Sequence, residues 1–481
     1  MRLCSSWLEK KEGCSHPKVL YAVLLLLPLL YFQSLNLVSF YNNKESWTTE
    51  IYDAYIAVGH DKRAKEVLNN DASSDSRYEN GHPYDSLPTW MTSYFQWHSH
   101  QLDLIHNTKT ATTKNQNDDG RNHQWRHHKV LLVRCMDDDR CGGTSDRLKS
   151  LPLFLILAAQ TNRLLFLRWN RPFALEEFLI PNNQNQQLYN NADDNKNQNN
   201  YFWNWTVPSS LVTILDAELT DGGGPYNQTT ILSKKSQQLV SAVQNPNIWL
   251  VQGNLQFSGA ALYESLAKEM KAKDEKVSSM NVSRAAAVSD FTTLYHYFFH
   301  ATFAPAPAIR SIVDELFQRL QLQPNRFVVV HIRAKYPGEV FRETGNLTAL
   351  EEIVDNAICI ASNNLIPNNT KNSEVMPIYL ASDAMPVLQA GMKHSNVVSR
   401  LSSSAQQQHN AEENDPPHLN FAQKDEPSAF YSIFVDLIVM SQSRCVTFGA
   451  GGFGRFGSLV SYDVSCRQPH TIKGKMQPCT G

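Results

Sequence analysis

Four short stretches of the sequence combine glycines, cations and carboxylates in patterns that suit a phosphorylated ligand. The first is the pair Gly142-Gly143, which stands between an apolar run and a helical pattern. Paired glycines let the backbone approach a ligand closely, and the N-terminus of the following helix offers unpaired N–H groups to a diphosphate. The spacing fits neither the dinucleotide-binding motif nor the P-loop. The alternative is an ordinary tight turn with Ser145 or Asp146 as the helix N-cap.

The second stretch places His331 and Arg333 at the end of the apolar run FVVVHIR. A guanidinium at a buried strand end requires an anionic partner, and its planar fork suits two phosphate oxygens at once. The alternative is a structural ion pair with a nearby carboxylate, such as Glu339 or Glu343.

The third and fourth stretches also follow apolar runs. Ser382-Asp383 ends the run IYLAS, where a carboxylate can accept from the N1–H and the exocyclic amine of guanine. The alternative role of this carboxylate is a helix N-cap. The segment from Gly449 to Arg455 follows the run CVTF, and its glycines indicate close approach of the backbone to a ligand, with a flexible turn as the alternative.

The apolar runs that carry these stretches alternate with helical patterns, as is typical of α/β domains. Strands are predicted at 129–134, 164–169, 327–333, 376–383 and CVTF, and helices after Gly143, at 347–365 and at 428–443. The pattern restarts near Pro324. We therefore expect two Rossmann-like domains, at 129–324 and 325–470, which face a ligand cleft at the carboxyl ends of their strands.

The run from Val19 to Phe40 is uncharged and mostly apolar. As a helix it reaches roughly 33 Å, enough to span the hydrocarbon core of a bilayer. Basic residues precede it, and acidic residues outnumber Lys44 just after it. The positive-inside rule then predicts a single-pass type II transmembrane anchor with the body of the protein in the lumen. A cleaved signal peptide is the alternative.

Two further features suit a lumenal body. Six of the eight cysteines follow the anchor, which allows up to three disulfides. Sequons for N-glycosylation also lie past it, at Asn204, Asn227, Asn281, Asn346 and Asn368. Residues 41–128 show little sustained periodicity, so we interpret them as a mostly disordered stem, with residues 1–18 as a cytosolic tail and 471–481 as a C-terminal tail.

Taken in order, the four stretches resemble the fucosyltransferases that use GDP-fucose, namely the protein O-fucosyltransferase-like group and the related α-1,6-fucosyltransferases. The matching segments lie within residues 129–465 and read CGGTSDRLKSLPLFLILAAQTNRLLFLRWNRPFALEEFLIP, FVVVHIRAK, IYLASD and FYSIFVDLIVMSQSRCVTFGAGGFG. The resemblance implies a GT-B architecture, an inverting mechanism, no metal and no other cofactor, and a home in the Golgi or endoplasmic reticulum membrane. The first domain would then be the acceptor side, and the second would bind the GDP-sugar.

The resemblance also implies roles for individual residues. Arg333 would grip the β-phosphate, His331 and Asp383 would contact the guanosine, and Gly142-Gly143 would face the diphosphate. The same nucleotide-sugar site is expected to include Asp146, Arg147 and Ser382.

The sequence departs from the α-1,6 enzymes directly after His-x-Arg. Those enzymes continue with a second Arg and an Asp, whereas Ala334, Lys335 and Tyr336 follow here. The acceptor and the linkage therefore stay open. For the catalytic base we take Glu339, with Glu343 as the alternative.

The predicted reaction moves fucose from GDP-fucose to a hydroxyl of a protein or glycan, with Arg333 in the role that a metal has elsewhere. One alternative is a metal-dependent GT-A transferase that uses Asp137, Asp138 and Asp139 as its metal site. The other is a non-catalytic, membrane-anchored relative that binds a glycan or a nucleotide. The formal net charge of −2 gives no reason to expect a nucleic acid as partner.

Overall fold

The computed structural model describes the residues 87, 89–112, 128–135, 141–182, 203–209, 211–212, 248–252, 291–335, 345–365, 376–401, 426–463, 466–472 and 474–479. The predicted anchor at 19–40, the candidate bases Glu339 and Glu343, and the acidic triplet at 137–139 lie outside the described residues. Within the segments given above, no helix combines the length and the apolar character needed to span a bilayer.

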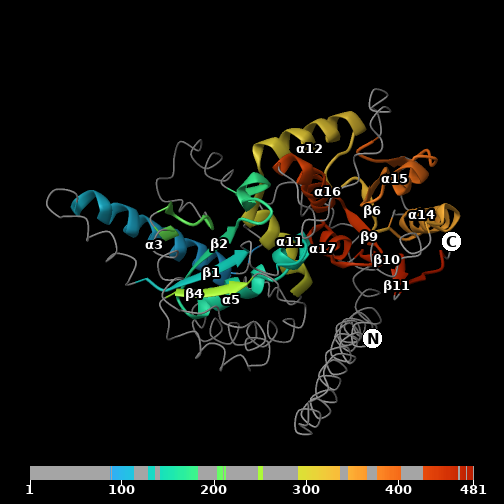
Figure 1. The fold of residues 1–481 in the computed structure, drawn as a ribbon. Helices are drawn as coiled ribbons and strands as arrows, with labels where there is room; N and C mark the ends of the chain where they lie inside the picture. Colours follow the sequence, from blue (N-terminus) through green and yellow to red (C-terminus); the bar gives the residue numbers. More distant parts are fainter. Residues whose placement is uncertain are drawn as a thin grey trace, which may run out of the picture. The chain divides into compact units, whose positions relative to one another are not determined.

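A three-stranded parallel sheet forms the first α/β unit (Figure 1). Its strands, in the order β2-β1-β4, are β1 (Val130–Cys135), β2 (Leu164–Trp169) and β4 (Ile248–Gln252). β1 and β2 are buried on both faces, which explains why each reads as a continuous apolar run. Between them in sequence lie α4 (Thr144–Leu148) and α5 (Leu151–Gln160). The predicted succession of strand, glycine turn, helix and strand is confirmed.

A helix that was not predicted, α3 (Thr89–Thr112), packs against β2. The interpretation of residues 41–128 as a mostly disordered stem is wrong for this segment. Its apolar side chains recur at helical spacing and are buried, namely Met91, Tyr94, Phe95, Leu102 and Ile105. The Tyr94 hydroxyl donates to the Arg163 carbonyl at 2.8 Å and accepts from the Leu165 N–H at 3.1 Å, which ties α3 to the start of β2.

The second α/β unit contains a five-stranded parallel sheet. In the order β10-β9-β6-β7-β8, its strands are β6 (Val328–Ile332), β7 (Ile378–Ser382), β8 (Val397–Val398), β9 (Cys445–Phe448) and β10 (Gln468–Pro469). From β8 to β10, these strands are the third, second, first, fourth and fifth of the sheet in chain order, as in a doubly wound Rossmann domain. The strands predicted at 327–333, at 376–383 and at CVTF are confirmed.

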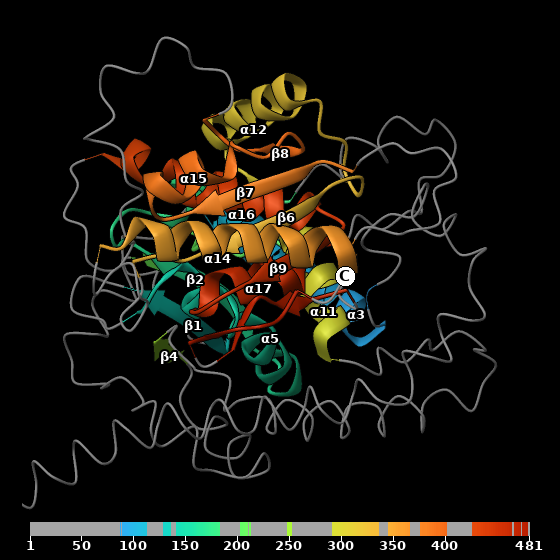
Figure 2. The same cartoon turned by 90° about the vertical axis from the view of Figure 1, so that its right-hand side faces the viewer.

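Helices cover both faces of this second sheet. They are α14 (Leu347–Ile360) with a π-helical extension (Ala361–Leu365), α15 (Met385–Gly391), α16 (Tyr431–Gln442) after the short η9 (Pro427–Phe430), and α17 (Gly452–Val460). Figure 2 shows α14 in front of the sheet, running roughly alongside β7. Val328 and Val330 belong to a core cluster with α14 and α15, whereas Val329 belongs to the cluster with α16 and α17. Successive side chains of β6 therefore pack on opposite faces of the sheet.

Two helices connect the units. α11 (Phe291–Thr302) contacts α17, and α12 (Pro307–Leu320) contacts α16. Nearby, β3 (Leu179–Pro181), which follows η5 (Leu175–Glu177), pairs antiparallel with β5 (Phe303–Pro305). A single hydrophobic cluster includes Leu131 and Leu165 of the first sheet as well as Val329 and Val446 of the second. The two units therefore share one core. The GT-B cleft stays a prediction.

One disulfide lies in the first unit and two lie in the second, to which the C-terminal residues also belong. The cysteines that follow the predicted anchor form three disulfides, Cys135–Cys141, Cys359–Cys479 and Cys445–Cys466. The interpretation of 471–481 as a tail is wrong for its described part. Here β11 (Thr471–Ile472) and β12 (Lys475–Met476) form a hairpin, and Cys479 is joined to α14.

His98 on α3 is buried and uncharged. Its Nε2 lies 3.1 Å from the Leu165 carbonyl oxygen, and its ring contacts Phe166 and Trp203. Burial lowers the pKa of His98 to about 3, although the hydrogen bond to Leu165 acts in the opposite direction. Below about pH 6.5 the unfolded chain therefore protonates His98, whereas the folded protein keeps this ring neutral down to about pH 3.

We expect His98 to make the protein less stable as the pH falls from about 6.5 toward 3, because the unfolded state binds its proton in this window and the folded state does not. His98→Gln should reduce the pH slope of the unfolding free energy by up to one proton, about 1.4 kcal/mol per pH unit. Denaturant titrations at several pH values measure the slope. His100→Gln, at an exposed position on the same helix, is the control. An unchanged slope in His98→Gln would contradict the prediction.

Candidate functional site

The order of the second sheet reverses beside β6, and doubly wound sheets bind ligands at the carboxyl ends of their strands at such a point. Pairing of β6 extends to Ile332↔Ser382 on the β7 side and to His331↔Phe448 on the β9 side. Arg333, Asp383 and Gly449 follow directly after these ends. Three of the four predicted motifs therefore emerge at one edge of one sheet.

Arg333 and Asp383 face each other across this edge. The Nε of Arg333 lies 3.9 Å from Oδ2 of Asp383, and both side chains are partly buried. Oδ1 of Asp383 accepts the backbone N–H of Ala334 at 2.8 Å and of Lys335 at 3.4 Å. Burial raises the pKa of Asp383, while the Arg333 guanidinium and these N–H groups partly offset the rise. Asp383 thus holds the loop after β6. It is not the N-cap of α15, which is Ala384.

The glycine turn before α17 lies against Arg333 on one side and against the first unit on the other. Gly451 has φ +86° and ψ 173°, a conformation almost restricted to glycine. An ideal Cβ on Gly451 would lie 2.7 Å from Nη1 of Arg333, and one on Gly452 would lie 2.9 Å from Oγ of Ser145. Since Ser145 belongs to α4, which contacts α17, the two predicted glycine motifs meet at this point.

The turn before α4 is closed by its own residues. Gly142 has φ +71°, and the Gly143 N–H donates to Oδ2 of Asp146 at 3.2 Å. Oδ1 of Asp146 forms an ion pair with Lys149. Asp146 therefore acts within the turn as the third residue of α4. The N-cap is Gly143, so the alternative with Ser145 or Asp146 as the N-cap is wrong.

Arg147 supports the same turn from inside. Its side chain is fully buried, its Nε donates to the Gly142 carbonyl at 3.1 Å, and its Nη1 donates to the Arg171 carbonyl. The guanidinium carbon lies 5.2 Å from the centroid of the Trp169 ring. Burial lowers the pKa of Arg147 to about 10. Arg147 therefore stabilises the turn before α4 through these hydrogen bonds.

His331 is also an internal residue of the site. Its ring packs 5.4 Å from the Phe453 ring, and an ideal Cβ on Gly454 would lie 2.4 Å from its Nδ1. Burial, together with the nearby Arg333, lowers the pKa of His331 to about 3, so the ring is neutral at pH 7. Only a glycine at 454 lets α17 begin this close to β6.

A buried network behind Asp383 was missed in the sequence. Asp436 on α16 accepts the Tyr379 hydroxyl at 2.8 Å and pairs with Nη1 of Arg400 at 2.6 Å. Nη2 of Arg400 donates to the Ser382 carbonyl at 2.9 Å. The sequence did contain a sign of this network, because Asp436 is the only charged residue of the apolar run 428–443 and a buried carboxylate needs a partner. The network fixes Ser382, the residue that precedes Asp383.

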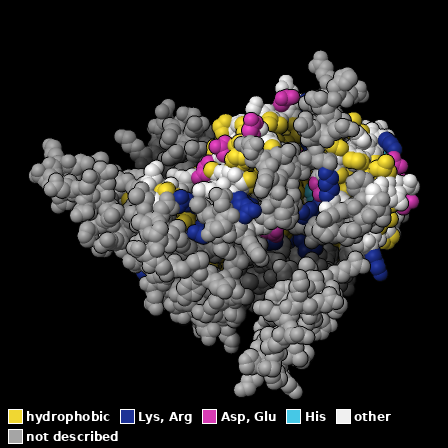
Figure 3. Space-filling view, in the orientation of Figure 1, with side chains coloured by type: hydrophobic (Ala, Val, Ile, Leu, Met, Phe, Trp, Pro, Cys, Tyr) yellow, Lys and Arg dark blue, Asp and Glu magenta, His cyan; other side chains and the backbone are white. Residues whose placement is uncertain are grey.

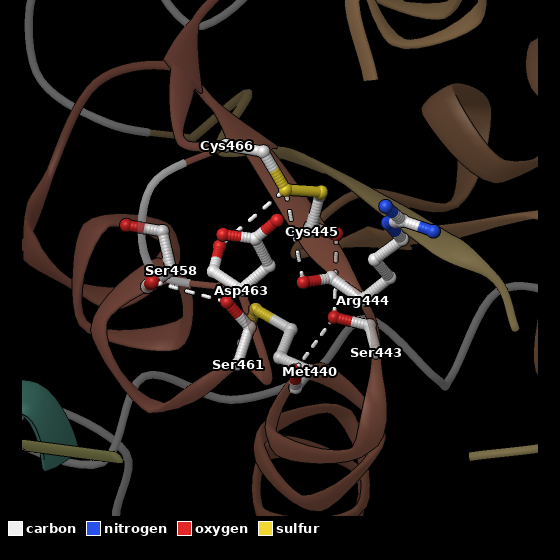
Figure 4. Close-up of a disulfide and its surroundings, with 8 residues drawn as sticks. All are labelled: Met440, Ser443, Arg444, Cys445, Ser458, Ser461, Asp463 and Cys466. Carbon is white, nitrogen blue, oxygen red and sulfur yellow. Dashed lines mark hydrogen bonds between the residues drawn. A yellow bond between two sulfur atoms is a disulfide. The ribbon is translucent and has the colours of Figure 1, made fainter. Parts of the chain in front are cut away.

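Among the described residues, the side chains of metal-ligating type that gather closely are Cys445, Asp463 and Cys466. Figure 4 shows the two cysteines joined in a disulfide beside Asp463. Because each sulfur is bonded to the other, neither is a thiolate ligand. This cluster therefore fastens the segment after α17 to the start of β9 and is not a metal centre.

The edge formed by Arg333, Asp383 and the glycine turn suits an anion. A guanidinium and the N-terminal N–H groups of α17 converge there, next to the turn of α4. Such groups together bind phosphate oxygens. Figure 3 shows Lys and Arg side chains at the surface where Figure 1 draws α11, α16 and α17.

Comparison with known proteins finds no family model and no curated relative that matches the sequence. Among solved structures, the chain is similar to a mutant of Arabidopsis thaliana FUT1 in complex with GDP, at 9% identity and TM-score 0.46, over 81% of this chain and 80% of that chain. It is also similar to NodZ alpha-1,6-fucosyltransferase soaked with GDP-fucose, at 12% identity and TM-score 0.38, over 69% and 93%, and to fucosyltransferase NodZ from Bradyrhizobium, at 13% identity and TM-score 0.37, over 69% and 92%. The fold assignment rests on strand order and register.

We expect Gly451→Ala to destabilise the folded protein by about 1–3 kcal/mol, because an L residue is strained at this φ and ψ. The added Cβ would also push against Arg333. Gly474→Ala is the control, since Gly474 has φ +73° and no atom within 4 Å of an added Cβ. Urea unfolding of both variants measures the difference, and a smaller loss in Gly451→Ala than in Gly474→Ala would contradict the close contact.

Proposed function

We propose that this chain is a glycosyltransferase that binds GDP-fucose at the carboxyl ends of β6 and β9 and transfers fucose to a hydroxyl of a protein or glycan. The observation that carries the proposal is the placement of Arg333 against the Gly451 turn, at the point where the strand order reverses. The resemblance of the four motifs to GDP-fucose-dependent enzymes selects the donor.

The proposed mechanism is inverting and does not use a metal. The acceptor hydroxyl attacks the anomeric carbon from the face opposite the GDP, and negative charge grows on the departing diphosphate. Arg333 and the N-terminal N–H groups of α17 neutralise that charge in the transition state. A carboxylate takes the acceptor proton, and for this role we retain Glu339, with Glu343 as the alternative. We place the enzyme in a secretory-pathway membrane, in line with the predicted anchor.

The roles of the remaining predicted residues follow from their contacts. Asp383 holds Arg333 and the following loop, and in the proposal its carboxylate also accepts from the guanine donors. His331, Ser382 and Arg147 are buried and act from within the protein, whereas Asp146 is partly exposed and is engaged in the turn before α4. The space beside Gly142 is filled by Asp146, which accepts the Gly143 N–H, so the predicted contact of Gly142 and Gly143 with the diphosphate has no support from this turn.

GDP should raise the thermal unfolding midpoint of the protein, because a ligand that binds the folded state stabilises it by mass action. ADP should not, since N1 of adenine carries no hydrogen and adenine has no 2-amino group, so it cannot offer a carboxylate the two adjacent donors of guanine. Asp383→Asn, which removes the charge and keeps the side-chain size, should shrink the GDP shift. Asp355→Asn, an exposed position on α14, is the control and should keep it. Equal shifts with GDP and ADP would reject guanine recognition.

Arg333→Ala should lower turnover by about 10²- to 10³-fold, or about 3–4 kcal/mol, because it removes a charge-assisted contact that strengthens as the bond breaks. Arg333→Lys should recover little, since an ammonium lacks the planar fork. EDTA should leave the wild type active. Arg326→Ala, an exposed arginine at the amino end of the same strand, is the matched control. A folded Arg333→Ala protein with near-normal fucose transfer would reject the mechanism.

A further inference from the structure

The C-terminal segment from Gln468 to Cys479 runs beneath the proposed donor site. It pairs with the end of β9, at Gln468↔Thr447 and Pro469↔Phe448. At its far end the segment is fastened to α14 by the Cys359–Cys479 disulfide and by the Asn356 side chain, which donates to the Gln477 carbonyl at 3.0 Å. Its course between these attachments is therefore fixed at both ends.

His470 is the residue of this segment that reaches β6. Its backbone N–H donates to the Phe448 carbonyl at 2.8 Å, and its Nε2 lies 3.1 Å from the His331 carbonyl oxygen. A carbonyl only accepts, so Nε2 carries the proton, and the Thr471 hydroxyl donates to Nδ1 at 3.0 Å. The side chain is 2% exposed, and burial lowers its pKa to about 4, so the ring is neutral at pH 7.

Gly449 has no side chain, and the His470 ring fills the space that a side chain there would take. An ideal Cβ on Gly449 would lie 2.6 Å from Cε1 of His470. The ring therefore lies next to Gly449, the first residue of the glycine turn, and next to His331, the last residue of β6 that pairs with β9. His331, whose carbonyl it binds, is two residues before Arg333. One imidazole thus joins both strand ends from which the site is built.

We propose that His470 is a positioning residue, which fixes the end of β6 through the His331 carbonyl and so directs Arg333 toward the diphosphate. This inference rests on the proposed function. The Cys359–Cys479 disulfide keeps the segment in place, and the site is complete only when the segment is docked. A strand end without this hydrogen bond lets the guanidinium shift, and small displacements of a catalytic group cost up to about 100-fold in rate.

The test uses the full chain and two substitutions of the same residue. His470→Phe keeps a flat ring and loses the N–H donor, so kcat for fucose transfer should fall by about 10- to 100-fold. His470→Gln places an amide N–H near the position of Nε2 and should restore most of the rate. His394→Phe, at a partly exposed histidine of the same unit that pairs with Asp355, is the matched control. GDP affinity, donor KM and thermal midpoint are measured for each variant, together with hydrogen exchange in peptides covering 331–335.

Recovery by Gln, together with faster exchange after His331 in the Phe variant alone, supports the inference. Equal losses in Phe and Gln variants would overturn it, because ring packing against Gly449 would then be the cause. A folded Phe variant with wild-type kcat, GDP affinity and exchange would overturn it as well. If the wild type neither binds GDP nor transfers fucose, the proposed function fails, while the exchange rates of the three proteins still decide whether His470 holds the strand end.

Discussion

A cation at the end of a buried strand is stable only where neighbouring groups compensate for its lost hydration, and the second unit is arranged around this constraint. Every residue of β6 is buried, and Arg333 follows directly. Asp383 supplies the opposite charge, and the N–H groups of Ala334 and Lys335 share that carboxylate. Each member of the group therefore depends on the strands that hold the others, and a shift of one strand end disturbs all of them.

The glycines around the start of α17 have no side chains, so this helix can lie close to β6 and to α4. Without a Cβ at 451 and 454, the turn and first helical turn of α17 reach Arg333 and His331. Without one at 452, they also reach Ser145 on α4. The N-terminal N–H groups of α17 are thereby brought beside the guanidinium, which neither element achieves alone.

Local patterns predicted most of the strands and several helices, because buried parallel strands are continuous apolar runs and their helices have a regular apolar stripe. It was the resemblance to the fucosyltransferases that implied a common site for Arg333, Asp383 and the glycine turns. The local patterns did not reveal which residues support the site. Arg147 and Asp146 are engaged in their own turn, and Arg400 and Asp436 act through a contact between distant segments. Helix α3 was missed because polar residues around it concealed a regular stripe from Met91 to Ile105.

The shared core has a consequence for how the protein moves. Domains that close on a ligand by a hinge need separate cores and few contacts across the boundary. Here the cluster that packs β1 and β2 continues through α11, α16 and α17 to β6 and β9. The two sheets should unfold in one cooperative transition, since neither can leave without exposing the apolar surface of the other. A ligand then enters by rearrangement of loops and side chains and by small sliding of packed helices, with both sheets moving little.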